Sequence, residues 1–236
     1  MSQDATAAVV RPEPPRRPGG GTWSSWGVPA ALVVLGTIPV VAGSLRLVEL
    51  SGGAETLPPD ARYDASPLPV VVHIASATVF ALVGAFQFSP LLRRRRPGWH
   101  RRAGRVLVVA GLGVALSALW LNQFYPRAGA TREVLYPLRV AFGSAMVVTL
   151  VLGFLAARRR DFTRHRAWMI RSYAIGLVAG TQVFTLGIGG LVLGTAHLTT
   201  ALLMAGAWAI NLTVAEWAIR RSGRRLPAAR SRPGPS

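Results

Sequence analysis

The sequence predicts an all-α polytopic membrane protein, a bundle of six transmembrane helices. Apolar residues make up 51% of the 236-residue chain, and they are gathered in runs of about 20 to 25 residues, the length that crosses a bilayer as a helix. The formal net charge is +18, but the arginines stand at the ends of these runs and are not spread over an amphipathic surface. Membrane topology therefore explains the charge better than nucleic-acid binding does, and we expect no nucleic-acid partner.

The first predicted elements are a polar tail and a span. Residues 1–25 are rich in Pro, Gly, Ser and Arg, and we expect a disordered tail there. The next run, residues 26–49, is too long for the apolar core of a secretory signal and is predicted to be the first span. Pro39 lies inside this run and is expected to kink the helix. Residues 51–67 carry acids and prolines and are predicted to form an exposed loop.

Five further apolar runs predict the other spans. In chain order they are residues 68–92, 104–124, 134–157, 168–193 and 199–219. Arginine clusters close the second and fourth of the six spans and lead into two short basic stretches, residues 98–105 and 164–173. The membrane domain thus covers residues 26–220, and residues 221–236 are predicted to be a second disordered, basic tail.

Glycines spaced by four residues mark the fifth predicted span. Gly176 pairs with Gly180, and Gly190 with Gly194. Small residues at this spacing let helix backbones approach closely, so this span is predicted to be central in the bundle.

The arginines also predict the orientation. Six spans put both termini on one side, and 22 of the 27 arginines fall on that side together with both basic stretches. The remaining five fall on the other side: Arg46, Arg62, Arg127, Arg132 and Arg139. By the positive-inside rule we expect a multi-pass protein of the bacterial inner (plasma) membrane, with the N and C termini in the cytoplasm.

Several classes of site are excluded or disfavoured. The chain has no cysteine, which excludes disulfides and thiolate metal sites. It has no P-loop, nucleophile elbow, HExxH pair or paired-carboxylate motif. We therefore predict no metal centre, and a non-enzymatic protein is favoured over an enzyme.

Polar groups inside spans are the first functional candidates, because each costs several kcal/mol unless it faces a partner or water. From the outer side inward they are Arg46, His73, Asn122, Arg139 and Gln182, and near the inner boundary Gln87, Arg171, Asn211 and Glu216.

The histidines have two interpretations. His73 lies roughly 8 Å below the start of its span, His197 is near the same outer level, and His100 and His165 are near the inner level. Histidines that pair across facing helices would bind a b-type haem, so His73 with His100, His165 or His197 indicates a transmembrane electron carrier. Alternatively, His100 and His165 lie among arginines at the headgroup boundary and bind lipid phosphate or helix ends. We favour the second interpretation and keep haem b as the alternative.

The arginines near the inner boundary also have two interpretations. Arg101, Arg105, Arg166 and Arg171 are candidates for an anion or lipid headgroup site, because guanidinium groups bind phosphate or carboxylate through paired bonds. The simpler and favoured interpretation is topogenic charge with attraction to anionic lipids, worth about 1 kcal/mol per residue.

One acid stands out in the last span. Setting aside Glu49 at the rim of the first span, Glu216 is the only acid placed within a span, and it is about level with Arg171. We predict an ion pair between them that is structural rather than catalytic.

Four groups of residues carry a resemblance to a known family. They are His73 with Gly84 and Gln87, the His-Arg-x-x-Gly-Arg stretch at 100–105, the His-Arg-x-Trp-Met-Ile-Arg-Ser-Tyr-Ala block at 165–174, and Asn-Leu-x-x-Ala-Glu-Trp at 211–217. Over residues 30–222 or so, the chain resembles the uncharacterised bacterial membrane-protein family catalogued as domain of unknown function 2306. The resemblance implies a polytopic membrane protein and no particular reaction.

The leading functional hypothesis is an integral membrane protein that acts as a small transporter, sensor or assembly factor. Its working surface is expected to be the cytoplasmic face that carries His100, His165 and the arginines around them. The expected partners are the lipid bilayer and its anionic lipids, while the substrate and the oligomeric state stay open.

Overall fold

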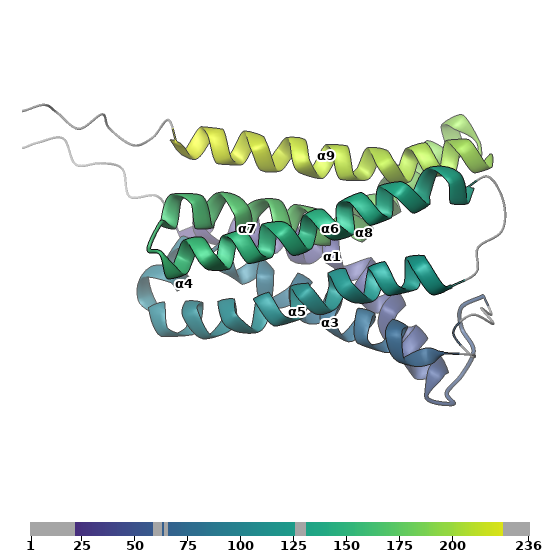
Figure 1. Ribbon diagram of the computed structural model, residues 1–236, viewed down its shortest axis with the longest axis horizontal. Helices are drawn as coiled ribbons and strands as arrows, with labels where there is room; N and C mark the ends of the chain where they lie inside the picture. The colour runs from purple at the N-terminus through teal and green to yellow at the C-terminus, as the bar shows by residue number, and fades with distance from the viewer. Residues whose placement is uncertain (1–21, 59–62, 64–65, 126–130, 224–236) are drawn as a thin grey trace, which may run out of the picture.

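The computed structural model describes residues 22–58, 63, 66–125 and 131–223 of the chain (Figure 1). These residues form helices and no strand. The helices are α1 (Thr22–Leu50), α3 (Pro67–Gln87), α4 (Pro90–Arg95), α5 (Pro97–Phe124), α6 (Thr131–Arg158), α7 (Phe162–Gly176), α8 (Val178–Leu193) and α9 (His197–Gly223). Helix begins at Thr22, inside the predicted first tail, while residues 1–21 and 224–236 of the two tails lie outside the described residues.

Five of these helices, namely α1, α3, α5, α6 and α9, are long and apolar enough to cross a membrane. Helices α7 and α8 meet the same criteria together, but they are bent by 44° at a break. The described chain thus has five candidate spans, or six if α7 and α8 cross as one. The predicted all-α polytopic fold is confirmed. The fifth predicted span was wrong as a continuous helix, because Leu177 interrupts it.

The first basic stretch is helical rather than a loop. Helix α3 ends at Gln87, short of the predicted Leu92, and the side chain of Ser89 accepts a hydrogen bond from the Leu92 backbone to start α4. Helix α5 then begins at Pro97, well before the predicted residue 104. Proline suits a first helical position because the N–H it lacks has no partner there in any case.

The second basic stretch starts a helix as well. After α6 ends, Arg160 takes a left-handed backbone conformation (φ 59°), and Asp161 caps α7 by accepting a bond from the Arg164 backbone at 3.0 Å. The chain therefore reverses within a few residues and places Arg164 to Arg166 in the first turns of α7. Figure 1 shows this connection, α4 and the C-terminal end of α9 at one end of the bundle, which we call the basic end.

The opposite end of α1 is fastened to the loop that follows it. Glu49 Oε1 accepts backbone bonds from Thr56 and Leu57, both at 2.6 Å. Arg46 forms an ion pair with Glu49 at 2.8 Å and donates to the Pro58 carbonyl at 2.9 Å. The described residues 51–56 and 58 are exposed, as predicted. Helix α1 runs unbroken through Pro39, and the kink expected there stays a prediction.

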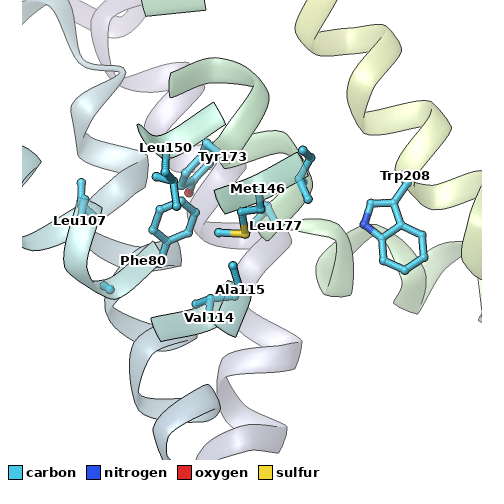
Figure 2. Packing of buried hydrophobic residues seen from close by; sticks show 11 residues of the cluster. Phe80, Leu107, Val114, Ala115, Met146, Leu150, Tyr173, Leu177 and Trp208 are labelled. Atoms are coloured by element: carbon cyan, nitrogen blue, oxygen red, sulfur yellow. The ribbon is translucent and has the colours of Figure 1, made fainter. Parts of the chain in front are cut away.

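The core lies between α3, α5, α6 and α7 (Figure 2). Phe80, Leu107, Met146 and Leu150 pack together there. Tyr173 joins them with its ring centroid 5.5 Å from that of Phe80. Apolar side chains such as Val34, Val109 and Leu116 are exposed on the outward faces, as expected of helices surrounded by lipid.

The glycine prediction holds for one pair and fails for the other. A Cβ on Gly180 would lie 2.3 Å from the Leu35 carbonyl oxygen, so α8 and α1 are in close backbone contact. Around Gly194 a Cβ would meet nothing within 4 Å, and the neighbouring Leu191 is 90% exposed. The fifth predicted span is therefore central only near the break, and its outer part lies at the surface of the described structure.

Candidate functional site

Polar side chains that join different helices gather in two places. The first, the α7–α9 seam, is defined by Arg171, Thr181, Asn211 and Glu216. The second, the basic cluster, lies at the basic end and is defined by Arg93, His100, Arg101, His165 and Arg166.

Arg171 and Glu216 form the charged part of the seam. Arg171 Nε donates to Glu216 Oε1 at 2.5 Å, and Arg171 Nη2 donates to Glu216 Oε2 at 3.0 Å. The guanidinium carbon also lies 4.9 Å from the centre of the Trp168 ring. The two side chains are 28% and 36% exposed. The structure thus brings together the two residues for which the sequence predicted a pair, in the paired geometry that a guanidinium fork prefers.

Asn211 forms the neutral part of the seam and lies beside the helix break. Its Nδ2 donates to the Ala174 carbonyl of α7 at 2.9 Å, while its Oδ1 accepts from Thr181 Oγ1 of α8 at 2.7 Å. Ala174 belongs to the last turn of α7, where carbonyls lack partners within the helix. One side chain of α9 therefore bonds both segments of the broken helix. The sequence marked Asn211 as polar within a span but gave it no role.

The basic cluster draws on three helices. His100 of α5 lies within electrostatic range of Arg93 from α4, of His165 from α7 and of its own neighbour Arg101. Arg166 of α7 is also within range of Arg93. Like charges at such range repel one another unless an anion or solvent compensates them.

His165 is held in a fixed orientation within the cluster. Its Nδ1 lies 2.8 Å from the Gly153 carbonyl of α6. Because a carbonyl only accepts hydrogen bonds, Nδ1 carries the proton and Nε2 is left for another partner.

The four arginines of the predicted anion site do not all meet. Arg101 and Arg166 belong to the basic cluster, whereas Arg171 is held by Glu216. Arg105 is exposed, and no ion pair to it is found within the described part of the chain. Arg93 was not among the predicted site residues, because it was taken as part of the arginine cluster that closes the second span after residue 92. The Ser-Pro pair that caps α4 is the signal that would have placed it at a helix end.

The other histidines lie apart from this cluster. His73 Nδ1 lies 3.0 Å from Ser117 Oγ and 3.3 Å from the Val114 carbonyl. Ser117 Oγ lies 2.5 Å from the Gly113 carbonyl and donates to it, so Nδ1 of His73 carries the proton in this arrangement and Nε2 does not. His197 is exposed at the start of α9. Across the described ranges, no three His, Cys, Asp or Glu residues form a group that could hold a metal ion.

Other polar side chains predicted within spans differ in whether they form hydrogen bonds. Asn122 donates to the Tyr136 carbonyl at 3.1 Å, and Gln182 donates to the Met204 carbonyl at 3.4 Å. Gln87 Nε2 is buried and has no hydrogen-bond partner among the described residues.

Comparison with known proteins identifies one family. A family model described as "Predicted membrane protein (DUF2306)" matches residues 70–219. The match runs from α3 to α9 and includes both the basic cluster and the seam. No curated protein and no solved structure matches the chain significantly.

Proposed function

This chain belongs to the DUF2306 family of predicted membrane proteins, and we propose that it binds a phosphate-bearing anion at the basic cluster. In this proposal the protein spans the bacterial inner membrane several times, both termini are cytoplasmic, and the basic end faces the cytoplasm. Binding of such an anion is the first step of transport, of sensing and of assembly on a lipid surface alike.

The observation that carries this function is the meeting of basic side chains from separate helices. Arg93, His100 and His165 come from α4, α5 and α7 and lie within electrostatic range of one another in the pairs described. A phosphate anion among them would replace repulsion by attraction. Guanidinium groups are the donors that suit phosphate oxygens, and Arg93, Arg101 and Arg166 supply them here.

The acidic residues at the basic end do not neutralise the arginines of the basic cluster. Among the described residues, the acids at this end are Asp161 and Glu216, and each already pairs with an arginine of its own. Asp161 lies 3.4 Å from Arg164, and Glu216 holds Arg171. The arginines of the cluster therefore keep their positive charge for an external partner.

Aromatic side chains favour a lipid as the source of the anion. Trp99, Phe162 and Trp217 are exposed at the basic end, with Phe162 67% exposed. Tryptophan is enriched at the headgroup level of membranes. A phosphate held by the basic cluster would lie at that level, so an anionic phospholipid headgroup fits better than a free phosphate.

Lipid binding in nanodiscs tests this function. We expect the wild-type protein to retain phosphatidylglycerol in a phosphatidylcholine background, as measured by native mass spectrometry. The double variant Arg93→Gln/Arg166→Gln should bind it more than about 100-fold more weakly, because each arginine would lose a charged hydrogen bond to the phosphate worth at least about 1.5 kcal/mol. Arg94→Gln/Arg95→Gln on the same short helix is the matched control and should lose only general surface attraction, about 30-fold at most.

Two outcomes separate the alternatives. Equal losses in the two double variants would reduce the cluster to general surface charge and contradict the proposed site. Displacement of the lipid by millimolar inorganic phosphate would assign the same site to a free anion rather than to a headgroup.

A second candidate is a b-type haem electron carrier. The observation in its favour is the Nδ1 bonding of His73, since a histidine held this way presents Nε2 to a metal. The packed core between α3, α5, α6 and α7 opposes a porphyrin there. A Cβ on Gly111 would lie 2.8 Å from the Phe80 ring, and one on Gly176 would lie 2.7 Å from it.

A further inference from the structure

The break at Leu177 is enclosed by other helices. Leu177 is buried, and a Cβ on Gly36 of α1 would lie 3.7 Å from its side chain. Gly180, just beyond the break, allows α8 to rest on the backbone of α1 at Leu35. Asn211 of α9 spans the break on another side. The bend is thus packed against α1, and Asn211 of α9 forms hydrogen bonds on both sides of it.

Asn211 substitutes for a bond that an unbroken helix would make. In a continuous helix the Ala174 carbonyl would accept from the backbone N–H of Val178, four residues on. In the bent chain this carbonyl accepts from Asn211 Nδ2 at 2.9 Å instead. Exchange of one hydrogen bond for another is nearly neutral in free energy. The Ala174 carbonyl therefore accepts one hydrogen bond in the bent form and one in the straight form, and this bond favours neither form strongly.

The bonds that hold α9 weaken toward the outer end. Two charged bonds join Arg171 to Glu216 on the inner side of the break, and neutral bonds of 2.9 and 2.7 Å meet at Asn211 beside it. Farther out, the bond from Gln182 to the Met204 carbonyl is 3.4 Å long. A hydrogen bond weakens as it lengthens, and charged bonds are about twice as strong as neutral ones. Helix α9 is therefore anchored at its inner half.

The outer part of α8 lies at the surface. Leu191 is 90% exposed and Val192 is 75% exposed. Gly194, with a φ of 80°, ends the helix and starts the short connection to α9. We define residues 178–196, which are α8 and its connection to α9, as the outer hairpin. Its tip, residues 191–196, is exposed in the described structure and would border lipid in a membrane.

We propose that the outer hairpin pivots at Leu177 and that Asn211 is the latch that holds the bent form. Release of Asn211 frees Ala174 to bond along the helix, and α7 and α8 then straighten into one span. The inner half of α9 stays fixed through Arg171 and Glu216. Discontinuous helices of this kind are a known element of alternating structures in membrane proteins. This device is independent of the anion site, because none of its residues belongs to the basic cluster.

Spin-label distances in nanodiscs test the latch, and a chain without cysteine makes the labelling clean. Labels at Leu191→Cys on α8 and Val109→Cys on α5 report on the pivot, and both positions are exposed. We expect one dominant distance in the otherwise unchanged protein. Asn211→Ala should add a second distance or broaden the distribution. A reference pair at Val109→Cys and Val148→Cys, on α5 and α6, should show no change.

The matched control is Thr213→Ala, also on α9. The hydroxyl of Thr213 donates to the Ala209 carbonyl of its own helix at 2.8 Å, so its loss should leave the distances unchanged. An Asn211→Ala distribution that matches the unmodified one, or an equal change in Thr213→Ala, would overturn the latch and make the bend a fixed feature. If Asn211→Ala does not assemble, Thr181→Val removes only the bond to α8. Broadening in that variant supports the latch, and an unchanged distribution contradicts it.

Discussion

Arg171 and Glu216 are 45 residues apart in the chain and face each other across the α7–α9 contact through bonds of 2.5 and 3.0 Å. The blocks 165–174 and 211–217, which carry much of the family resemblance, therefore meet in space. Asn211 adds a second contact between the same two blocks through Ala174. This seam fixes the inner half of α9 beside the basic end.

The first prediction concerns the free energy that couples this ion pair. In a double-mutant cycle of Arg171→Gln and Glu216→Gln, we expect a coupling energy of about 1 kcal/mol, since partly exposed pairs lie at the lower end for charged bonds. The measurement is reversible unfolding in detergent micelles at fixed protein concentration. The losses in free energy of unfolding of the two single variants should add up to more than the loss in the double variant. The reason is that each single variant leaves one charge without its partner.

An exposed pair supplies the control for this cycle. Arg164 and Asp161 are 79% and 40% exposed, and their coupling should fall well below that of the seam. Arg94→Gln, which removes an exposed arginine of α4, should also cost less than Arg171→Gln. A structural role for the seam would be contradicted if the two pairs had equal coupling energies. It would also be contradicted if Arg94→Gln and Arg171→Gln lowered the free energy of unfolding equally.

The second prediction concerns the contact of α3 with α7. A Cβ on Gly84 would lie 2.4 Å from the Tyr173 ring, and that ring is packed between Phe80 and Phe88. Gly84→Ala should therefore lower the free energy of unfolding by about 1 to 3 kcal/mol, the usual cost of overpacking. Displacement of the ring would also disturb the 2.7 Å bond from Tyr173 to the Ala81 carbonyl.

Gly104→Ala is the matched control for this substitution. A Cβ on Gly104 would meet nothing within 4 Å, so alanine should be neutral or should stabilise α5 by up to about 1 kcal/mol through helix propensity. If Gly84→Ala and Gly104→Ala unfold at the same temperature, the packing of Tyr173 against α3 is not as described.

The third prediction concerns haem. We expect protein purified from haem-replete cells to show no Soret absorption, because the close approach of Phe80 to Gly111 and Gly176 fills the space between the helices. The ultraviolet and visible spectrum, with a pyridine haemochrome assay, measures this directly. A stoichiometric Soret band that disappears in His73→Ala would instead establish the electron-carrier function.

The sequence was sufficient to predict where most of the long apolar helices lie. Long apolar runs mark spans whatever the tertiary packing, and the helices that hold them agree with the prediction to within several residues at most ends. The main errors fall at residues 98–105 and 164–166. Their arginines resemble loop residues by polarity, but Pro97 and the Asp161 cap start helices there.

The break at Leu177 was beyond the reach of the sequence. No proline stands there, and the apolar pattern is continuous across it. The bend depends on bonds from another helix, through Asn211, and on the close approach of Leu35 to Gly180. Such contacts are tertiary and leave no local signal beyond the paired glycines. In the basic cluster, Arg93 was missed for the same reason, because its position depends on where α3 ends.

The most direct test of the account is the side of the membrane that the basic end faces. Single cysteines at Glu55→Cys in the loop after α1 and at Thr163→Cys in the first turn of α7 occupy exposed positions at opposite ends. With a membrane-impermeant maleimide on intact spheroplasts, we predict labelling of Glu55→Cys alone, and labelling of Thr163→Cys only after the membrane is opened. Labelling of Thr163→Cys in intact spheroplasts would contradict a cytoplasmic basic face, and with it the proposed site for an anionic headgroup.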